Sequence, residues 1–564
     1  GHGRGWYVFY GLALRARCVP SGEGNPAAAL MAHVITKLPL ESGKGPSGTS
    51  FEFIMCIGNV NAKLVWDIIL HILRGRCPKE MCGAFASARL VACPKKGSND
   101  LRPISIGEAW RRVAGKVAVF LLRGKAAKIL KTVGQWGVGV RGGCEAAVHA
   151  VRLALHQIGP LGTKTEYGHD GKNTGSMNKP ITLESHLALP VDVSNAFCNL
   201  KRVPMFKAII KDLPEIFELA RLLYGQNTHL WFALDGASDK PRPQSTQAEN
   251  DTDLSEAAAA VLLDIQTKFR WILCVIGVHQ GCPLGSLLFC FGVLAVLQRV
   301  LLKFPFVRIP SIADDMTLVG PQLDVAAAFV ELKIGLGEIG LSVAAHKCKA
   351  ICATSIHPKA RELLEAAGLS DENKSFPSDG IVLCGAPVSA DFKVSENSPV
   401  PYERDSLCEI ISRNDEGNAK IMRLADGQAK YLIVRYCCAA RDSFFLRCVD
   451  PVSSELGALK HEEMVAKMLA GVLKFPGGPP ENDTRNPLYW AFRQARLPLR
   501  HGGLGTPPAS LIRSSAYYGS LSLTLPIILE YFGEIGVPDV LTSPLLGPLI
   551  QLNPLTISVD AETA

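Results

Sequence analysis

Three aspartates have the residue type and the spacing to bind divalent cations. Asp314 and Asp315 are adjacent in "PSIADDMTLVG", between two apolar stretches, and Asp192 lies in "VDVSNAF" earlier in the chain. Apolar runs on both sides of an acidic pair predict a buried β-hairpin with the acids at its turn. Like charges in such a place are costly unless a cation neutralises them. The pattern therefore predicts a divalent metal site that serves phosphoryl transfer.

The separation of Asp192 from the acidic pair fits a site that holds two metal ions. Two ions about 3.5–4 Å apart can activate an attacking hydroxyl and stabilise the leaving oxygen of an in-line displacement. Such a site needs carboxylates from separate strands, because one short segment cannot surround both ions. For any single aspartate the alternative is an ordinary turn residue at the end of a strand.

Two further segments carry groups that suit a nucleotide. "KKGSNDLRPISI" predicts the tip of a two-stranded hairpin, where Lys95 and Arg102 could grip a triphosphate. "GVHQGCPLGSLLF" predicts an irregular turn before a buried helix, and the Gln280 amide in that turn could meet a nucleotide or a template backbone. Taken alone, the second segment is better explained as a strand–turn–helix junction.

A basic segment suggests a polyanionic partner. The net charge of the 564-residue chain is +8, but residues 63–131 hold 15 Lys/Arg and only 4 Asp/Glu. Within the helix predicted there, Arg111, Arg112 and Lys116 are spaced for one side and could contact nucleic-acid phosphates. The alternative is a solvated basic helix face.

Length and composition limit the class of protein. A chain of 564 residues predicts several subdomains. Its 17 cysteines show no zinc-site spacing, which favours reduced thiols in an intracellular protein. The longest apolar run, residues 284–297, is broken by Gln298 and Arg299, and we expect it to be too short to span a bilayer.

The pattern of apolar residues predicts a mixture of helices and strands. Strands are expected on either side of the turn at 97–100, in "LALPVDV", at 268–277 and within 380–388, with a buried helix after 284. A helix followed by a strand is expected in "AAAFVELKIGLGEIGLSV". Two polar stretches, 162–178 and 235–253, read as loops or insertions, and the chain becomes mainly helical from about Ser389.

With these pieces in order, the chain resembles the reverse transcriptases of non-LTR retrotransposons from about Lys44 to Pro387. "SGKGPSGTSFE" and "LVACPKKGSNDLRPISIG" are similar to the family's finger motifs, and "QWGVGVRGGCEAAVHAV" is similar to its template-contacting segment. "VDVSNAF", "GVHQGCPLGSLLF", "IADDM", "GLSVAAHKCKAI" and "VLCGAPV" resemble the five palm motifs in order. "QARLPLRHGGLG" resembles a segment that follows the polymerase core.

The resemblance implies an α+β fold of the right-hand polymerase type, with fingers, an antiparallel-sheet palm and a mainly helical thumb and C-terminal region. It implies an N-terminal extension at 1–43, fingers at 44–180, a palm at 181–390 with a finger insertion at about 200–270, a thumb-like region at 391–480 and a C-terminal region at 481–564.

The resemblance also implies roles for individual residues. It assigns Asp192, Asp314 and Asp315 as the metal-binding triad, with Val193 as a further metal ligand and Lys347 as a candidate general acid. The groups implied to contact nucleotide or nucleic acid are Lys95, Arg102, Gln280 and Gly281 for the incoming nucleotide and template, and Arg141 together with Arg111, Arg112 and Lys116 for nucleic acid.

Phe197 is the position that separates DNA from RNA synthesis. It lies five residues after Asp192, where the family keeps a bulky aromatic residue under the sugar. A ring there would collide with a ribose 2′-hydroxyl and so favours deoxynucleotides. The alternative is an apolar side chain packed in the core.

The chain departs from the family at two places. Ile312 stands where the family usually has Tyr or Phe before "ADD", and Ala344 stands where it usually has Asn before the lysine. These departures are typical of an ageing copy of a mobile element, whereas retention of all three aspartates argues against complete decay.

The resemblance implies an RNA-directed DNA polymerase that uses two Mg²⁺ ions, or Mn²⁺. Its implied partners are an RNA template, deoxynucleoside triphosphates and a DNA primer or nicked target DNA, with no membrane. It implies action in the nucleus after a cytoplasmic, RNA-bound phase. Two alternatives stay open: an intron-type reverse transcriptase with splicing activity, and a non-catalytic RNA-binding protein of the same fold.

Overall fold

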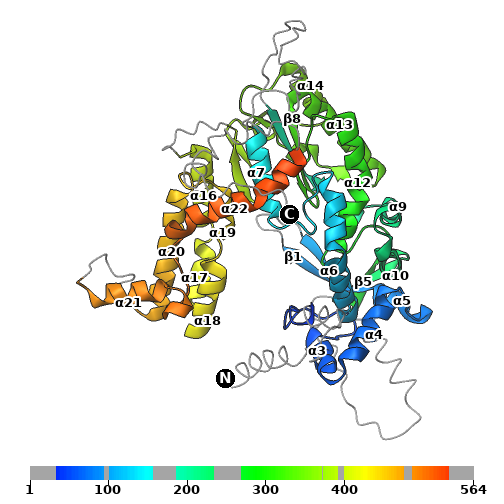
Figure 1. The fold of residues 1–564 in the computed structure, drawn as a ribbon, viewed down its shortest axis with the longest axis horizontal. Helices are drawn as coiled ribbons and strands as arrows, with labels where there is room; N and C mark the ends of the chain where they lie inside the picture. The colour runs from blue at the N-terminus through cyan, green and yellow to red at the C-terminus, as the bar shows by residue number, and fades with distance from the viewer. Residues whose placement is uncertain are drawn as a thin grey trace, which may run out of the picture. The chain divides into compact units, whose positions relative to one another are not determined.

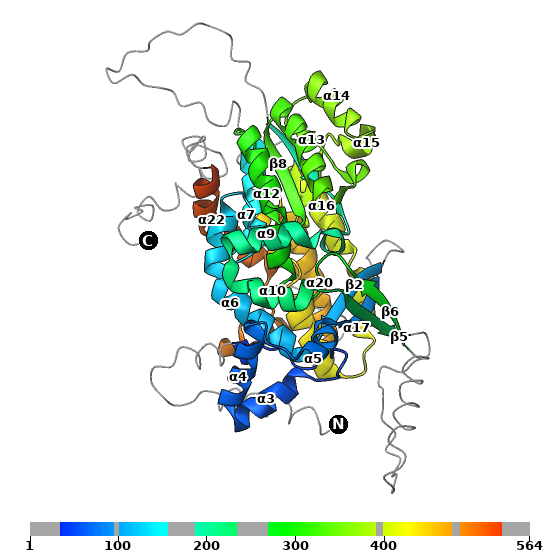
Figure 2. The same ribbon diagram turned by 90° about the vertical axis from the view of Figure 1, so that its right-hand side faces the viewer.

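The computed structural model describes residues 34–94, 101–155, 186–233, 269–370, 372–390, 399–475 and 485–532. The chain divides into two compact units, each formed by separate stretches of sequence. The first unit contains residues 1–130, 193–296 and 335–342. The second unit contains residues 131–192, 297–334 and 343–564. Figures 1 and 2 show the elements of each unit.

The first unit contains a four-stranded sheet in the order β2-β1-β5-β6. β1 (Ala88–Pro94) and β2 (Leu101–Gly107) pair antiparallel from Ala88↔Gly107 to Pro94↔Leu101. β5 (Thr228–Ala233) pairs parallel with β1 and antiparallel with β6 (Phe269–Cys274). The two strands predicted around residues 97–100 are thus confirmed as a hairpin, although its turn and the 235–253 insertion lie outside the described residues.

Most of the other described elements of the first unit are helices. They are α3 (Phe51–Val60), α4 (Ala62–Leu73), α5 (Lys79–Ala86), α6 (Ala109–Lys131), α8 (Ala196–Asn199), α9 (Arg202–Asp212), η1 (Pro214–Ile216), α10 (Phe217–Tyr224) and most of α12 (Gly285–Lys303). Two short strands, β4 (Val193–Ser194) and β9 (Ser342–Val343), lie next to the points where the chain passes from one unit to the other. In α6 most alanines and valines are buried, and the lysines and arginines are half-buried or exposed, with the exception of the buried Arg111.

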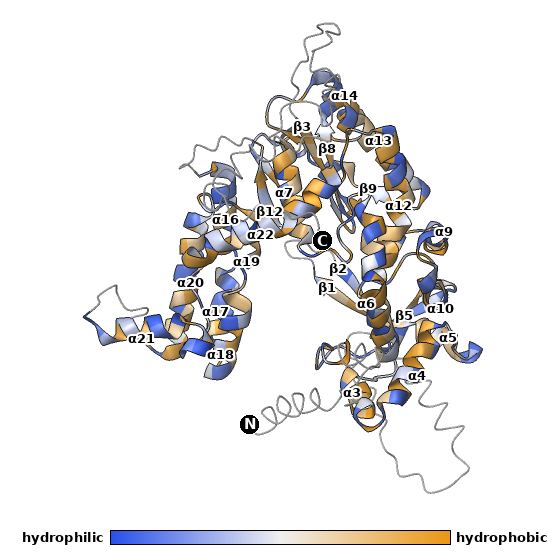
Figure 3. Cartoon of the chain, viewed as in Figure 1, coloured by the Kyte–Doolittle hydropathy of each residue, from blue (hydrophilic) through white to orange (hydrophobic). Residues whose placement is uncertain are grey.

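Helix α12 is a long and strongly apolar helix (Figure 3). The helix continues through Gln298 and Arg299 to Lys303, so the expectation that this run is too short to span a bilayer is wrong. Within the described residues it alone is long and apolar enough to cross a membrane by length and composition, and 67% of that window is buried inside the protein. The core helix of a globular protein has the same properties.

The second unit contains a sheet in the order β10-β3-β8-β7, all antiparallel. Its strands are β3 (His186–Val191), β7 (Ser311–Ile312), β8 (Asp315–Pro321) and β10 (Ile351–Cys352). The central pair, β3 and β8, runs in register from His186↔Pro321 to Val191↔Met316. Both strands are buried along nearly their whole length, which fits a sheet covered by helices and hairpins.

Helices and one hairpin pack around this sheet. α7 (Gly143–Leu155) contacts β3, β7 and β8, and the hairpin of β11 (Gly380–Leu383) and β12 (Ala386–Ser389) contacts α7 through β12. α22 (Ala509–Phe532) lies beside α7 and α19 (Ser443–Cys448), as Figure 1 shows. One hydrophobic cluster joins α7, β3, β8, β11, β12 and α22. The other helical elements are α13 (Gln322–Glu338), η2 (Ala345–Lys347), α14 (Pro358–Ala366), α15 (Glu372–Ser375), α16 (Pro401–Ser412), α17 (Asp415–Met422), α18 (Gly427–Ile433), η3 (Val434–Cys438), α20 (Glu455–Leu473), α21 (Pro487–Arg496) and η4 (Leu499–His501).

The structure mixes helices with mostly antiparallel sheets, in agreement with the predicted α+β class. After Pro401 the described secondary-structure elements are all helical, joined by short turns and loops, in agreement with the predicted mainly helical character. The division into fingers, palm and thumb, and its boundaries, stay predictions. The polar stretch 162–178 lies outside the described residues.

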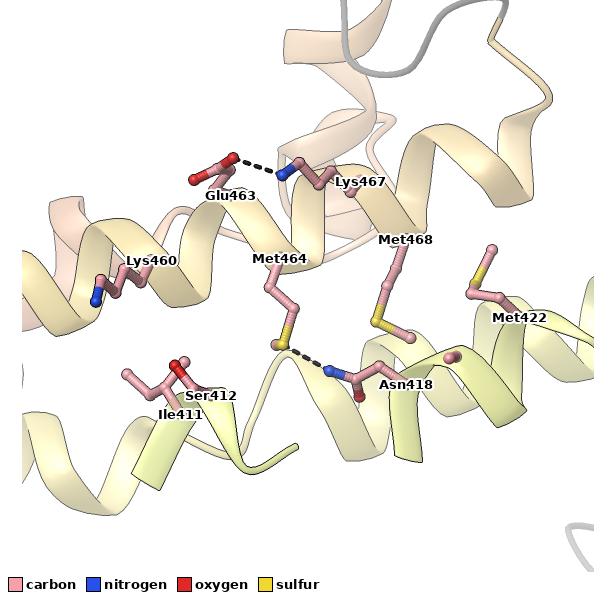
Figure 4. Close-up of a pocket in the computed structure, with 10 residues that line it drawn as sticks. Ile411, Ser412, Asn418, Met422, Lys460, Glu463, Met464, Lys467 and Met468 are labelled. Atoms are coloured by element: carbon pink, nitrogen blue, oxygen red, sulfur yellow. Dashed lines mark hydrogen bonds and ion pairs between the residues drawn. The ribbon is translucent and has the colours of Figure 1, made fainter. Parts of the chain in front are cut away.

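A cavity of about 490 Å³ lies among the helices of the second unit (Figure 4). Its walls come from α16, α17 and α20, and three methionines, Met422, Met464 and Met468, line it. Lys467 on its rim pairs with Glu463 at 2.6 Å. The residues that line this cavity include no residue of the predicted site.

Candidate active site

The acidic pair lies at the turn of a tight hairpin, as the sequence predicts. β7 and β8 pair through Ser311↔Met316 and Ile312↔Asp315, which leaves a two-residue turn of Ala313 and Asp314. Ala313 has a φ of +54°, a left-handed conformation that side chains other than glycine rarely adopt. Asp314 therefore projects from the turn itself, and Asp315 is the first residue of β8.

The pairing of β3 with β8 brings Asp192 and Asp315 to the same edge of the sheet. The last paired residues of the two strands are Val191 and Met316. Asp192 follows Val191 and Asp315 precedes Met316, so the two aspartates occupy the next position of the same antiparallel register. Side chains directly opposite in such a register have Cβ atoms about 4.5–5.5 Å apart. Two elements that are more than a hundred residues apart in sequence thus present carboxylates at one sheet edge.

The surroundings of the three carboxylates differ from the prediction. Asp192 and Asp315 are exposed and Asp314 is half-buried, whereas Met316, Thr317, Leu318 and Val319 behind them are buried. The expectation of buried acids is therefore wrong, because the apolar flanks enter the core while the turn stays at the surface. Within the described chain, no three His, Cys, Asp or Glu side chains are close enough together to hold a metal ion.

The segment that carries Lys347 is anchored beside Asp192. The main-chain N–H of Ala344 donates to the Asp192 carbonyl at 2.8 Å, and the N–H of Asp192 donates to the Cys348 sulfur at 3.4 Å. Lys347 is exposed and lies between these two contact residues in sequence, at the end of η2. Burial raises the pKa of Cys348 to about 11, so its sulfur is a neutral thiol. Ala344, one of the two departures from the family, meets Asp192 through its main chain and not its side chain.

Gln135 belongs to this site, and sequence reasoning missed it. The resemblance implies a template contact for its segment, "QWGVGVRGG", but Gln135 is fully buried and its amide bonds to the main chain of Ala313. Arg141, from the same segment, is exposed and stays a candidate for nucleic-acid contact. The signal in the sequence was an amide residue between an amphipathic helix and a glycine-rich turn, which does not reveal its partner.

A pair of thiols also lies near Asp315. Cys144, at the start of α7, and Cys384, at the β11–β12 turn, interact through a side-chain hydrogen bond. The negative charge of Asp315 acts to raise the pKa of both thiols. The hydrogen bond from Cys384 lowers the pKa of the Cys144 thiol to about 7, although burial and the charges of Glu145 and Asp315 oppose this shift. The spacing of the cysteines in sequence gave no sign of this pairing.

We expect Cys144 to become reactive near neutral pH. The thiolate is the nucleophile, so its alkylation by iodoacetamide, followed by peptide mass spectrometry, should rise with pH through a midpoint of about 7. Cys384→Ala removes the hydrogen-bond donor and should move this midpoint upward, toward the ordinary thiol value. An unchanged midpoint in Cys384→Ala would contradict the assignment.

In the first unit, the structure brings Gln280 and Gly281 next to β2. The Gln280 carbonyl accepts a hydrogen bond from the Ser105 N–H at 2.7 Å. Gly281 has a φ of +105°, and a Cβ added there would lie 3.0 Å from the Ser105 carbonyl oxygen. Arg102 is exposed near the start of the same strand. Lys95, predicted to act with Arg102, lies outside the described residues.

Phe197 is held by a second ring. It stacks on the buried Phe289 of α12, with ring centroids 4.9 Å apart and an interplanar angle of 13°, and is itself half-buried. A Cβ added at Gly285 would come within 3.6 Å of the Phe197 ring. The ring is therefore fixed in orientation and partly accessible. Val193 is half-buried, four residues earlier.

Arg111 has a structural role, which corrects its assignment as a nucleic-acid contact. Only 1% of it is exposed, and its guanidinium donates to the Ala86 carbonyl and contacts Nδ1 of His279 at 2.9 Å. Burial, together with the charges of Arg111 and Arg202, holds the pKa of His279 well below its ordinary value, so the imidazole is neutral. Arg111 thus ties α6 to the end of α5 and to the turn before α12.

The other two basic residues predicted on α6 are only half-buried. The Arg112 guanidinium donates to the Gly43 carbonyl and the Ser42 hydroxyl and lies 4.2 Å from the Phe51 ring centroid. Its donors therefore hold the 42–45 loop. Burial and, to a smaller extent, the charge of Arg112 lower the pKa of Lys116. Lys116 stays a candidate for contact with a phosphate. The helix spacing placed all three on one side, but Arg111 faces the core.

No protein-family model and no curated protein match this chain. Among solved structures, apo telomerase from Candida tropicalis is similar at a TM-score of 0.34 and 11% identity, over 81% of this chain and 67% of that one. Telomerase from Candida albicans in complex with a TWJ fragment of telomeric RNA is similar at a TM-score of 0.29 and 13% identity, over 71% of this chain. This chain covers 63% of the Candida albicans chain, which is less than two thirds.

Proposed function

We propose that this chain is an RNA-directed DNA polymerase that copies an RNA template by two-metal nucleotidyl transfer, in the service of retrotransposition. The observation that carries the proposal is the shared sheet edge of Asp192 and Asp315, with Asp314 in the adjoining turn. The order of the sequence motifs around these residues supports it. An RNA template, a DNA primer or nicked target DNA and deoxynucleoside triphosphates are the proposed partners, and the nucleus is the proposed place of action.

The donor set fits Mg²⁺ in its chemistry. Carboxylate oxygens are the ligands that Mg²⁺ prefers, and it commonly binds through one or two carboxylates, several waters and substrate phosphates. Asp192, Asp314 and Asp315 would hold the ions, with Val193 next to Asp192. When bound, such ions would supply positive charge that activates the attacking hydroxyl and stabilises the leaving pyrophosphate.

Exposure of the carboxylates suits this role. Asp192 and Asp315 are open to solvent, so a metal–nucleotide complex can reach them without the protein unfolding. Lys347, exposed and anchored through its own segment to the main chain of Asp192, is the proposed donor of a proton to the leaving pyrophosphate. Arg102, Gln280 and Gly281 are proposed to bind the incoming nucleotide and template, and Arg112, Lys116 and Arg141 are candidates for phosphate contacts.

The experiment is template copying with purified protein. A heteropolymeric RNA with an annealed DNA primer, Mg²⁺ and four deoxynucleotides should give a DNA product whose sequence is complementary to the template. Matched reactions with a DNA template of the same sequence, or with ribonucleotides, should give less product. Binding of RNA without any extension would favour the alternative of a non-catalytic RNA-binding protein. RNA-dependent cleavage or joining of an intron would favour the intron-type alternative.

We expect Phe197→Ala to relax the choice of sugar. The stacked ring would no longer exclude a ribose 2′-hydroxyl, and discrimination against ribonucleotides should fall by about tenfold to a hundredfold. The ratio of kcat/KM for dTTP and UTP in primer extension measures this effect. Phe206→Ala removes a ring of equal size from α9 and should leave the ratio unchanged. Equal ratios in wild type and Phe197→Ala would rule out a steric gate.

A further inference from the structure

Gln135 makes a two-point hydrogen bond to one residue of the acidic hairpin. Its Oε1 accepts from the Ala313 N–H at 2.7 Å, and its Nε2 donates to the Ala313 carbonyl at 3.0 Å. The Gln135 side chain is fully buried, with 0% of its surface exposed. Ala313 immediately precedes Asp314. The main-chain N–H and carbonyl of Ala313 are therefore both hydrogen-bonded to the side-chain amide of Gln135, which is shielded from solvent.

The conformation of Ala313 explains why such a contact matters. A non-glycine residue at a φ of +54° is strained by about 1 kcal/mol or more and persists only when its surroundings hold it. The two-residue turn fixes where Asp314 projects and where Asp315 enters β8. Relaxation of Ala313 to an ordinary backbone conformation would therefore redirect both carboxylates.

Neighbouring contacts hold Gln135 itself in register with the hairpin. The Trp136 N–H donates to the Ser311 carbonyl and the Ser311 N–H donates to the Gly134 carbonyl, each at 2.8 Å. These bonds form a parallel bridge between Gln135 and Ser311. A Cβ added at Gly137 would lie 2.8 Å from the Ala313 nitrogen, so the segment lies directly against the turn.

We propose that Gln135 is a positioning residue, which holds Ala313 in its left-handed conformation and thereby fixes the direction of the Asp314 and Asp315 carboxylates. The role in catalysis rests on the proposed function, whereas the clamp on the hairpin does not. The segment 134–137 then acts as a rigid support of the acidic turn and not as a surface for the template.

The chain offers a matched control in Gln322, a second buried glutamine of the same unit. Gln322 is 4% exposed and its Oε1 accepts from the His357 N–H at 2.6 Å. It follows the far end of β8, roughly 20 Å from Asp315 at the usual rise of a strand. Gln135→Met and Gln322→Met each replace a buried amide with an apolar side chain of similar length.

Hydrogen exchange of the full chain tests the clamp without any assumption about activity. Gln135→Met should raise exchange in peptides that cover residues 309–318 by about tenfold, because the Ala313 N–H loses its acceptor. Gln322→Met should leave those peptides unchanged. Wild-type exchange in Gln135→Met, or an equal rise in Gln322→Met, would overturn the proposal.

Primer-extension kinetics test the consequence for catalysis. Gln135→Met should lower kcat by about tenfold to a hundredfold with little change in the KM for dTTP, because misplaced carboxylates affect the transition state more than ground-state binding. Gln322→Met should keep both constants. A raised KM at unchanged kcat in Gln135→Met would overturn the positioning role. If the wild type proves inactive, the proposed function fails. The hydrogen-exchange result still shows whether Gln135 holds Ala313 in its conformation.

Discussion

Asp315→Asn should lower the rate of Mg²⁺-dependent primer extension by about a thousandfold or more, and Asp314→Asn should lower it markedly as well. Asparagine keeps the size of the side chain and one oxygen, but it lacks the negative charge that a divalent ion requires. A thousandfold loss corresponds to about 4 kcal/mol of transition-state stabilisation. Single-turnover extension of a labelled primer measures the rate directly.

The fold should tolerate these substitutions. Asp315 is exposed, and its pairing with Ile312 runs through the main chain. Asp379→Asn, an exposed aspartate directly before β11, is the matched control and should leave the rate unchanged. A folded Asp315→Asn protein that retains the wild-type rate would show that this carboxylate holds no catalytic metal.

The second large effect is expected on stability, at a buried ion pair in the second unit. Arg152 of α7 and Glu403 of α16 are 1% and 0% exposed and meet at 3.0 Å. The Arg152 guanidinium also donates to the carbonyls of Cys448 and Pro387, so it joins α7 to three other elements. Burial outweighs the attraction of Arg152 and raises the pKa of Glu403 above its ordinary value.

Arg152→Met should therefore destabilise the protein by about 3–5 kcal/mol, because it leaves the Glu403 carboxylate buried without its partner. The double variant Arg152→Met, Glu403→Leu should recover part of this loss, since no uncompensated charge remains, although the Cys448 and Pro387 carbonyls still lack the Arg152 donor. Urea unfolding followed by circular dichroism measures both. Arg413→Met, which breaks the exposed ion pair between Arg413 and Glu409, should have little effect on the free energy of unfolding. A double variant no more stable than Arg152→Met would mean that the lost hydrogen bonds and packing, and not the unpaired charge, set the cost.

Local patterns in the sequence predicted much of the fold. The apolar flanks of Asp314 and Asp315 specified a hairpin with the acids at its turn, and β7 and β8 form it. The strands on either side of residues 97–100 and the helix after 284 follow from apolar periodicity in the same way. These features depend on neighbours close in sequence, which is what periodicity records.

The features that were missed depend on contacts between distant segments. Arg111 and Arg112 are neighbours in the same basic helix, and the sequence predicts the same role for both. Only the packing of α6 against α5 shows that Arg111 faces the core. The bond between Gln135 and Ala313 joins residues 178 positions apart, and no local pattern predicts it. The exposure of Asp192 and Asp315 is set by where the sheet ends, which strand periodicity leaves open.

Nucleotide incorporation on poly(rA)/oligo(dT) tests the central claim most directly. Purified wild-type protein with Mg²⁺ and dTTP should extend the primer in a ladder that chelation by EDTA abolishes and that Asp315→Asn does not produce. The absence of extension by folded wild-type protein with either Mg²⁺ or Mn²⁺, or equal extension by Asp315→Asn, would contradict the assignment of Asp192, Asp314 and Asp315 as a polymerase centre.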